Sequence, residues 1–379
     1  MGNIIDYIRE YGTYSLLERP FSDEDSLVIA QFSYLKLERV LTGNEEGHSG
    51  VTVGAIRHSD RFEELFADTR FAEDNYALFE AMRTSRRFQT MQVADCAYRL
   101  DRTEPSQFFA CTCLLEDGSV CIVFRGTDET LAGWKEDCYL SSRAPVTSQK
   151  LSAAYLDRAA GRWEGTLLVG GHSKGGNLAV YGAMHCQAQV RRRIRQIYSL
   201  DGPGVLPCHR DAVTYPEIRG RIRKIVPHSS LVGMLFEDSR TYTVVESSTF
   251  GLLQHNPFSW IVRDGRFETV RDIYRGRKAA VEVLNRWIET MGLAEQEALT
   301  KELFAILDAA EVETLLDFSG NWAQTARRMA RALRDTDGQM AGELRRAWGL
   351  LLAAGKEVAG AHRGAQTDDG CTGENHKME

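Results

Sequence analysis

The chain lacks the cysteine and histidine spacing that marks a metal site. It has 8 cysteines and 9 histidines in 379 residues, with no C-x-x-C pair and no H-E-x-x-H motif. This pattern disfavours a zinc enzyme or a redox dithiol. Cys111, Cys113 and Cys121 lie on alternating, strand-like sequence where small buried residues are common, so we expect the cysteines to be reduced. We therefore predict neither a metal nor another cofactor.

Long apolar runs and an excess of positive charge are also missing. No stretch approaches 18 apolar residues, and the first ten residues carry Asp6, Arg9 and Glu10 in place of an apolar leader segment. The formal net charge of -7 disfavours nucleic acid and anionic membranes as partners. Basic runs at 191–195 and 219–224 are expected to be solvated helix ends or loops. These features favour a soluble, cytoplasmic protein without a transmembrane segment. The sequence does not indicate its oligomeric state.

Hydrophobic periodicity divides the chain into four stretches. Residues 1–88 show helical spacing, and residues 89–275 alternate strand-like with helical runs, which is typical of a mostly parallel sheet covered on both faces. Residues 276–360 keep a helical period, and residues 361–379 are polar, as in disordered tails. We expect an α/β fold with helical additions at both ends. The C-terminal addition, residues 276–360, either packs on the α/β core or covers the substrate.

A glycine-rich turn connects a strand-like run to a helix-like run. The sequence G-H-S-K-G-G at residues 171–176 follows the apolar residues 166–170 and opens a helical run. It fits G-x-S-x-G, in which glycines allow a turn too sharp for side chains and the serine stands above the sheet. We predict Ser173 as the nucleophile. The alternative is a glycine-rich turn that serves packing alone.

A serine nucleophile needs an acid and a base that follow it in the chain. Asp201 comes directly after the predicted strand 197–200, where parallel sheets build their sites, although it can also start the Gly-Pro-Gly turn that follows. His255 lies in a late, turn-like loop that can reach over the serine. His228 is its competitor, and His209 follows Asp201 too closely. We predict Asp201 as the acid and His255 as the base.

The tetrahedral intermediate of acyl transfer needs two hydrogen-bond donors for its oxyanion. One is the backbone N–H after the nucleophile, which here belongs to Lys174, and the other comes from a loop after an earlier strand. Thr127 lies in such a loop, behind the strand-like run 120–124. We predict Thr127 and Lys174 as the oxyanion hole. The alternative is an ordinary loop with an ion pair between Arg125 and Asp128.

These motifs resemble those of lipases. F-R-G-T at residues 124–127 and W-x-x-D at residues 134–137 are similar to a segment of class 3 lipases, and residues 171–176 are similar to their G-H-S-x-G-G elbow. Together with L-D-G-P-G at 200–204, Gln254-His255 and an N-I-x-D-Y N-terminus, they resemble an uncharacterised, mostly bacterial family of lipase-like α/β-hydrolases. The resemblance covers most of residues 1–320 and implies an α/β-hydrolase fold.

The acid departs from the class 3 pattern. Those lipases carry their aspartate after the next strand, where this chain has V-P-H-S-S at residues 226–230, so the resemblance does not supply the acid. Asp201 instead resembles the L-D-P acid of pancreatic-type lipases. Glu237 and Asp238 are less favoured because they follow a stretch of unclear type.

The residues together predict a serine hydrolase of the lipase or esterase type. It would cleave a carboxylic ester or thioester, of a small molecule or a lipid, through an acyl-Ser173 intermediate without a metal. Two alternatives stay open. One is a hydrolase-fold binding or scaffold protein with weak turnover, and the other is a peptidase or amidase that uses the same triad.

Overall fold

The computed structural model describes residues 2–41, 50–67, 69–128, 131–143, 145–210, 213–237, 241–309 and 342. Of the predicted C-terminal helical region 276–360, the part up to 309 and residue 342 fall within these ranges. The predicted tail 361–379 lies outside the described residues. Within the described ranges, no helix is both long enough and apolar enough to cross a membrane.

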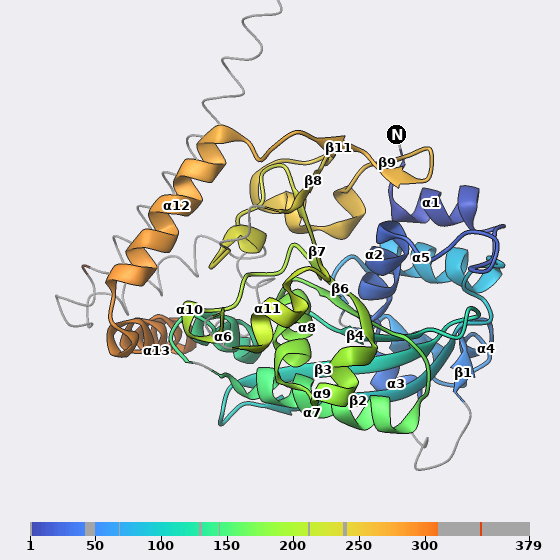
Figure 1. Ribbon diagram of the computed structural model, residues 1–379, viewed down its shortest axis with the longest axis horizontal. Helices are drawn as coiled ribbons and strands as arrows, with labels where there is room; N and C mark the ends of the chain where they lie inside the picture. The colour runs from blue at the N-terminus through green and yellow to red at the C-terminus, as the bar shows by residue number, and fades with distance from the viewer. Residues whose placement is uncertain are drawn as a thin grey trace, which may run out of the picture.

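A nine-stranded mixed sheet forms the centre of the fold, with strand order β1-β2-β3-β4-β5-β6-β7-β8-β11 (Figure 1). Strands β4 to β8 run parallel to one another, whereas β1, β2 and β3 at one edge and β11 at the other pair antiparallel. The bounds are β1 Val51–Thr52, β2 Gln92–Asp101, β3 Ser106–Leu114, β4 Val120–Phe124, β5 Leu167–His172, β6 Ile194–Leu200, β7 Ile222–Pro227, β8 Thr243–Val245 and β11 Thr269–Val270. A separate two-stranded sheet consists of β9 Val262–Arg263 and β10 Arg266–Phe267.

The α/β-hydrolase fold predicted from the sequence is confirmed by this arrangement, in which a central parallel sheet is flanked by helices. The predicted strands β2 to β8 all form. The sequence does not predict β1, β9, β10 or β11, because each spans two residues and is too short to show alternation. The hairpin at residues 115–119 closes as expected, with the Leu115 N–H donating to the Ser119 carbonyl at 3.0 Å.

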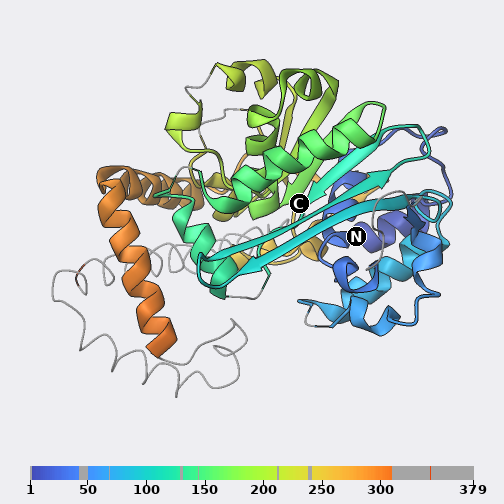
Figure 2. The ribbon, with the colours of Figure 1, turned by 90° about the horizontal axis from the view of Figure 1, so that it is seen from below.

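Helices cover both faces of the sheet. Figure 2 shows the strands between the blue N-terminal helices on one side and the green helices on the other. Because neighbouring residues of a strand face opposite sides, Leu168 packs with the N-terminal helices while Leu167 and Val169 pack with α7 and α8. The blue layer contains α1 Ile4–Tyr11, α2 Asp23–Phe32, α3 Leu37–Val40, α4 Val53–Ile56 and α5 Ala72–Thr84; the other helices are α6 Leu131–Tyr139, α7 Thr147–Arg162, α8 Lys174–His185, α9 Ala188–Arg193, α10 Pro207–Arg210, α11 Thr214–Arg219, α12 Arg275–Thr290 and α13 Leu293–Ala309.

A fully buried ion pair organises the N-terminal layer. Arg87 follows α5, and its Nη2 donates to Asp25 Oδ2 in α2 at 2.5 Å, with both side chains completely buried. The Nε–H also donates to Asp25 Oδ1, at 2.6 Å. Nη1 and Nη2 donate in addition to backbone carbonyls of the segment between α1 and α2, namely those of Tyr14, Ser15, Arg19 and Pro20. One side chain therefore fixes both helices and the loop between them.

Replacing Arg87 with Met should destabilise the protein strongly, because it leaves the Asp25 carboxylate buried without its partner. We expect a loss of about 3–5 kcal/mol in the free energy of unfolding, measured by urea titration. The matched control is Arg86→Met, since Arg86 pairs with Glu18 at 3.1 Å on the exposed surface and should cost at most about 1 kcal/mol. Equal losses in the two variants would contradict the role given to the buried pair.

Candidate active site

Ser173 stands on the sharp turn between β5 and α8. Its backbone has φ 58° and ψ -132°, a left-handed conformation that is costly for a residue with a Cβ. The turn needs glycine at positions 171 and 175. A Cβ on Gly171 would lie 2.4 Å from the Phe124 carbonyl oxygen, and a Cβ on Gly175 would lie 2.0 Å from it, which is too close for either. The Ser173 N–H donates to the Leu200 carbonyl at 2.9 Å, which ties the turn to the end of β6. The sequence motif therefore adopts the predicted elbow geometry.

The three residues predicted as a triad lie in one hydrogen-bonded chain. His255 Nε2 is 2.8 Å from Ser173 Oγ, and His255 Nδ1 is 2.6 Å from Asp201 Oδ2. Asp201 follows β6 and is buried, whereas His255 ends the short 3-10 helix Gly251–His255 and stays 25% exposed. With Nδ1–H donating to the carboxylate, Nε2 is free to accept the serine proton. Their catalytic roles remain predictions.

Asp201 is held on its other oxygen by a serine that the sequence does not predict. Ser230 Oγ donates to Asp201 Oδ1 at 2.5 Å, and the Gly233 N–H donates to the same oxygen at 3.2 Å. Ser230 follows β7, at the position where class 3 lipases carry their acid. In this chain that position holds a serine, and it hydrogen-bonds Asp201, which follows the neighbouring strand β6. The turn after Asp201 also packs on the elbow, because a Cβ on Gly202 would lie 2.6 Å from the Ser173 carbonyl oxygen.

The competing candidates lie elsewhere. His228 Nδ1 is 3.1 Å from Glu246 Oε1, and the ring of His209 packs on Tyr181. Glu237 pairs with Lys224 at 2.8 Å. Asp238 lies outside the described residues.

Gln254 anchors the loop that carries His255. Its buried side chain accepts from the Ser229 N–H at 2.7 Å and donates to the Thr249 carbonyl at 2.6 Å. Its Nε2 also lies 3.0 Å from His228 Nε2. The Gln-His pair in the sequence thus joins an anchor to the candidate base.

Thr127 lies in the loop after β4 that packs directly against the elbow. A Cβ on Gly126, the residue before it, would lie 3.0 Å from Ser173 Cβ. The Thr127 hydroxyl donates to Asp137 Oδ2 at 2.5 Å, so the prediction that Thr127 binds an oxyanion rests on its backbone N–H. The ion pair considered between Arg125 and Asp128 does not form.

The charged residues of this loop bind the N-terminal layer instead. Arg125 pairs with Glu38 at 2.7 Å, and Asp128 lies 3.8 Å from Lys36. The Arg125 guanidinium also donates to the carbonyls of Ser33 and Leu35. These contacts hold the loop of Thr127 against the segment that follows α2.

His172 is the buried neighbour of Ser173, the candidate nucleophile. Burial and the nearby charge of His255 hold the pKa of His172 well below its usual range. Its Nδ1 is 3.1 Å from Tyr34 Oη, and its ring lies 4.5 Å from that of His255. His172 therefore stays neutral, so an imidazolium formed on His255 does not face a second cation.

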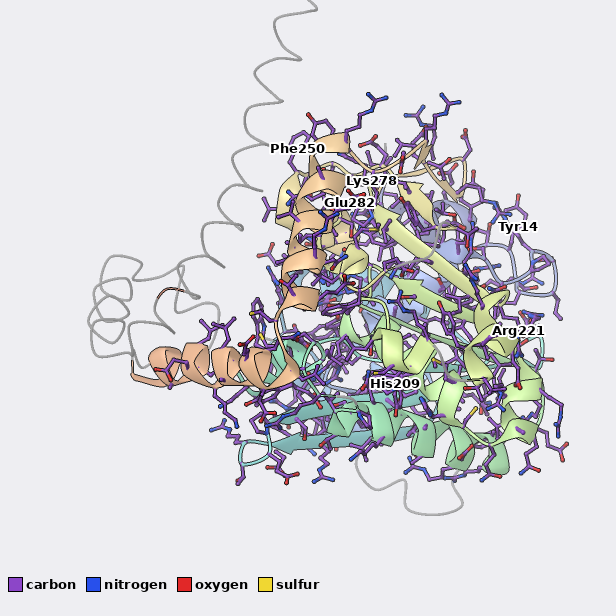
Figure 3. All side chains as sticks on the ribbon, turned by 60° about the vertical axis from the view of Figure 1, so that its left-hand side comes forward. Tyr14, His209, Arg221, Phe250, Lys278 and Glu282 are labelled. Carbon is purple, nitrogen blue, oxygen red and sulfur yellow. The ribbon has the colours of Figure 1, made fainter. Side chains whose placement is uncertain are left out.

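Exposed apolar side chains lie on the loop of His255. Phe250 and Leu253 are 53% and 66% exposed. Figure 3 shows Phe250 near the end of α12 that carries Lys278, and a Cβ on Gly251 would lie 3.7 Å from Arg277 Nη2 of α12. The rim of the site is thus partly apolar.

The C-terminal helices contact α6, the segment that follows α6 and the segment that follows β7. Asn285 of α12 donates to the Met234 carbonyl at 3.1 Å, beyond β7. Glu297 of α13 pairs with Arg143 at 2.7 Å, and Lys135 of α6 lies 5.6 Å from the Phe304 ring. Both helices, orange in Figure 1, therefore pack on the hydrolase body.

No group of three or more histidine, cysteine, aspartate or glutamate side chains in the described ranges is arranged to hold a metal ion. Sequence reasoning misses Ser230, Gln254, Glu136 and Asp137 as parts of this site. For Asp137 a signal exists, because the W-x-x-D resemblance includes it. For Gln254 a signal also exists, because the resemblance includes Gln254-His255. Ser230 carries no such signal, since its contact with Asp201 joins segments that are distant in sequence.

The fold and this geometry define an α/β-hydrolase-fold protein with a Ser-His-Asp arrangement at the carboxyl ends of its parallel strands. The chain belongs to the Mbeg1-like family, whose model matches residues 82–305. Among solved structures it is similar to the crystal structure of M37 lipase, with 15% sequence identity and a TM-score of 0.36 over 56% of this chain and 70% of that chain. No curated protein matches the chain. The fold is established by the sheet topology described above, while the relation to class 3 lipases and the motifs that carry it stay predictions.

Asp137 should titrate near neutral pH. About a third of its side chain is exposed (34%), but Oδ1 is buried, and burial raises the pKa to about 6, against the opposing effects of Lys174 and the Thr127 hydrogen bond. Because burial disfavours the charged form, the carboxyl should hold its proton below pH 6. Carbon NMR of labelled aspartate, with Asp137→Asn to assign the signal, measures this pKa. A midpoint near the ordinary value of about 4 would contradict the burial.

Thr127→Val tests which group of Thr127 serves the oxyanion. The variant keeps the backbone N–H and loses only the hydroxyl, which Asp137 already engages. We expect kcat on p-nitrophenyl acetate to fall by about 10-fold or less with KM unchanged, since a direct oxyanion donor would cost about 10²-fold or more. A larger fall would show that the hydroxyl is needed for the oxyanion hole, either as a donor itself or because its bond to Asp137 holds the backbone N–H in place.

Proposed function

We propose that the protein is a serine hydrolase that cleaves a carboxylic ester or thioester through an acyl-Ser173 intermediate. The observation that carries the proposal is the chain from Ser173 Oγ to His255 Nε2 at 2.8 Å and from His255 Nδ1 to Asp201 Oδ2 at 2.6 Å. A hydroxyl, an imidazole and a carboxylate in this order activate a serine for acyl transfer.

In the first half of the reaction, Ser173 Oγ attacks the ester carbonyl and its proton passes to His255 Nε2. The backbone N–H groups of Thr127 and Lys174 bind the oxyanion, and Asp201 stabilises the imidazolium. The intermediate collapses as the bond to the leaving alcohol or thiol breaks, and the leaving group takes the proton from Nε2. Water then attacks the acyl-serine with His255 again as base, which releases the acid and restores the serine.

The apolar rim favours a substrate with an apolar acyl or alcohol group. Phe250 and Leu253 are exposed on the loop of His255, where they can contact such a group. A peptidase or amidase would use the same residues and differ in its pocket. A scaffold without turnover is less well supported, because nothing in binding alone requires the strained backbone of Ser173, at φ 58°.

Reaction with a fluorophosphonate probe tests the proposal, because the probe labels only an activated serine. We expect stoichiometric labelling that maps to Ser173. Ser173→Ala should abolish it, and His255→Ala should slow it by about 10³-fold or more.

His228→Ala is the matched control, since His228 also lies beside this loop but contacts Gln254 and Glu246 rather than the serine. Its labelling rate should stay close to that of the unchanged protein. An adduct on another serine, or equal losses in the two histidine variants, would refute the proposed triad.

A further inference from the structure

Lys174 has a side chain that the hydrolytic mechanism does not use. Its backbone N–H is the candidate oxyanion donor, but its side chain is 99% buried, and Nζ points away from the serine into the body of the protein. Nζ donates to Gln107 O at 2.7 Å, Gln107 Oε1 at 3.1 Å and Glu136 Oε2 at 3.0 Å. All three ammonium protons are therefore engaged, so the side chain has none left for a substrate.

Glu136 is equally buried and equally engaged. Besides Lys174, its carboxylate accepts from the Gln107 N–H at 3.0 Å, from the Ser148 N–H at 2.9 Å and from Ser148 Oγ at 2.7 Å. These partners lie on β3, at the start of α7 and at the start of α8. The carboxylate thus joins α6 to three other elements.

The next residue of α6 holds the other oxyanion donor. Asp137 Oδ2 accepts from the Thr127 hydroxyl at 2.5 Å, and its Oδ1 lies 4.0 Å from Lys174 Nζ. Two consecutive carboxylates of one helix therefore bind the two residues proposed as oxyanion donors, Glu136 binding Lys174 and Asp137 binding Thr127.

We propose that Glu136 and the Lys174 side chain are positioning residues for the oxyanion hole. They act through the backbone, fixing the first turn of α8 relative to the loop of Thr127. The inference rests on the proposed function and adds a role that neither side chain has in the hydrolytic steps.

Energetics favour this role over a purely stabilising one. A buried ion pair gains little net stability over apolar side chains of the same volume, because desolvation offsets the attraction of the charges. Preorganised donors, by contrast, are worth a great deal to an oxyanion, and a shift of about 1 Å can cost about 10²-fold in rate. A saturated pair of charges also fixes both partners in direction, which apolar packing does not.

The test separates the loss of the pair from the loss of stability. Lys174→Met keeps the backbone N–H but leaves the Glu136 charge buried alone, so the variant should be strongly destabilised. Adding Glu136→Gln removes that charge and should restore most of the stability. We expect kcat on p-nitrophenyl acetate to stay about 10- to 100-fold low in the double variant, with KM within about twofold of the unchanged protein.

A second buried pair supplies the control. Arg87→Met with Asp25→Asn removes the pair in the N-terminal layer, and this variant should lose stability but keep kcat when assayed at a temperature at which it is folded. Recovery of kcat together with stability in the Lys174→Met/Glu136→Gln protein would overturn the inference, as would a change confined to KM. If Lys174→Met alone does not fold, the double variant decides.

The outcome is distinguishable from a failure of the proposed function. If the proposed function is wrong, the unchanged protein will neither hydrolyse the ester nor react with the fluorophosphonate, and the positioning role will then be refuted as well. Activity in the unchanged protein with full activity in the double variant would refute the positioning role alone.

Discussion

The close approach of three backbone segments at the end of β4 is the constraint on which the site depends. The Phe124 carbonyl oxygen occupies the space that a Cβ on Gly171 or Gly175 would need, and the Ser173 carbonyl does the same for Gly202. Without side chains between them, the ends of β4, β5 and β6 can meet at van der Waals distance. The strained backbone of Ser173 is held in place by this contact, which would present the proposed nucleophile above the sheet.

Adjacent parallel strands then supply the functional groups in order. The end of β4 leads to Thr127, β5 to Ser173, β6 to Asp201 and β7 to Ser230, so neighbours in the sheet become neighbours in the site. The proposed acid, Asp201, follows β6, and Ser230 after β7 donates a hydrogen bond to it. The charges around the site are also arranged. His172 stays neutral beside His255, Glu136 forms an ion pair with Lys174, and Asp137 accepts a hydrogen bond from Thr127.

Much of this arrangement could be predicted from the sequence, and the physical reason differs from part to part. The elbow is local, since glycines and a serine between a strand and a helix specify their own geometry, and Asp201 follows from strand order. The N-terminal layer shows helical spacing, but its attachment through Arg87 and Arg125 depends on carbonyls distant in sequence. Ser230 and Glu136 are likewise ordinary residues in their own segments. Their roles exist only once β7 meets β6 and α6 meets α8.

We propose that Ser173 is an activated nucleophile and that the backbone N–H groups of Thr127 and Lys174 bind the oxyanion of its tetrahedral intermediate. A crystal structure of the protein after reaction with a phosphonate tests it most directly, because the phosphoryl oxygen stands in for the oxyanion of the intermediate. The account predicts a covalent bond from Ser173 Oγ to phosphorus, with that oxygen about 3 Å from both nitrogens. A phosphoryl oxygen turned away from these groups, or an adduct on another residue, would contradict it.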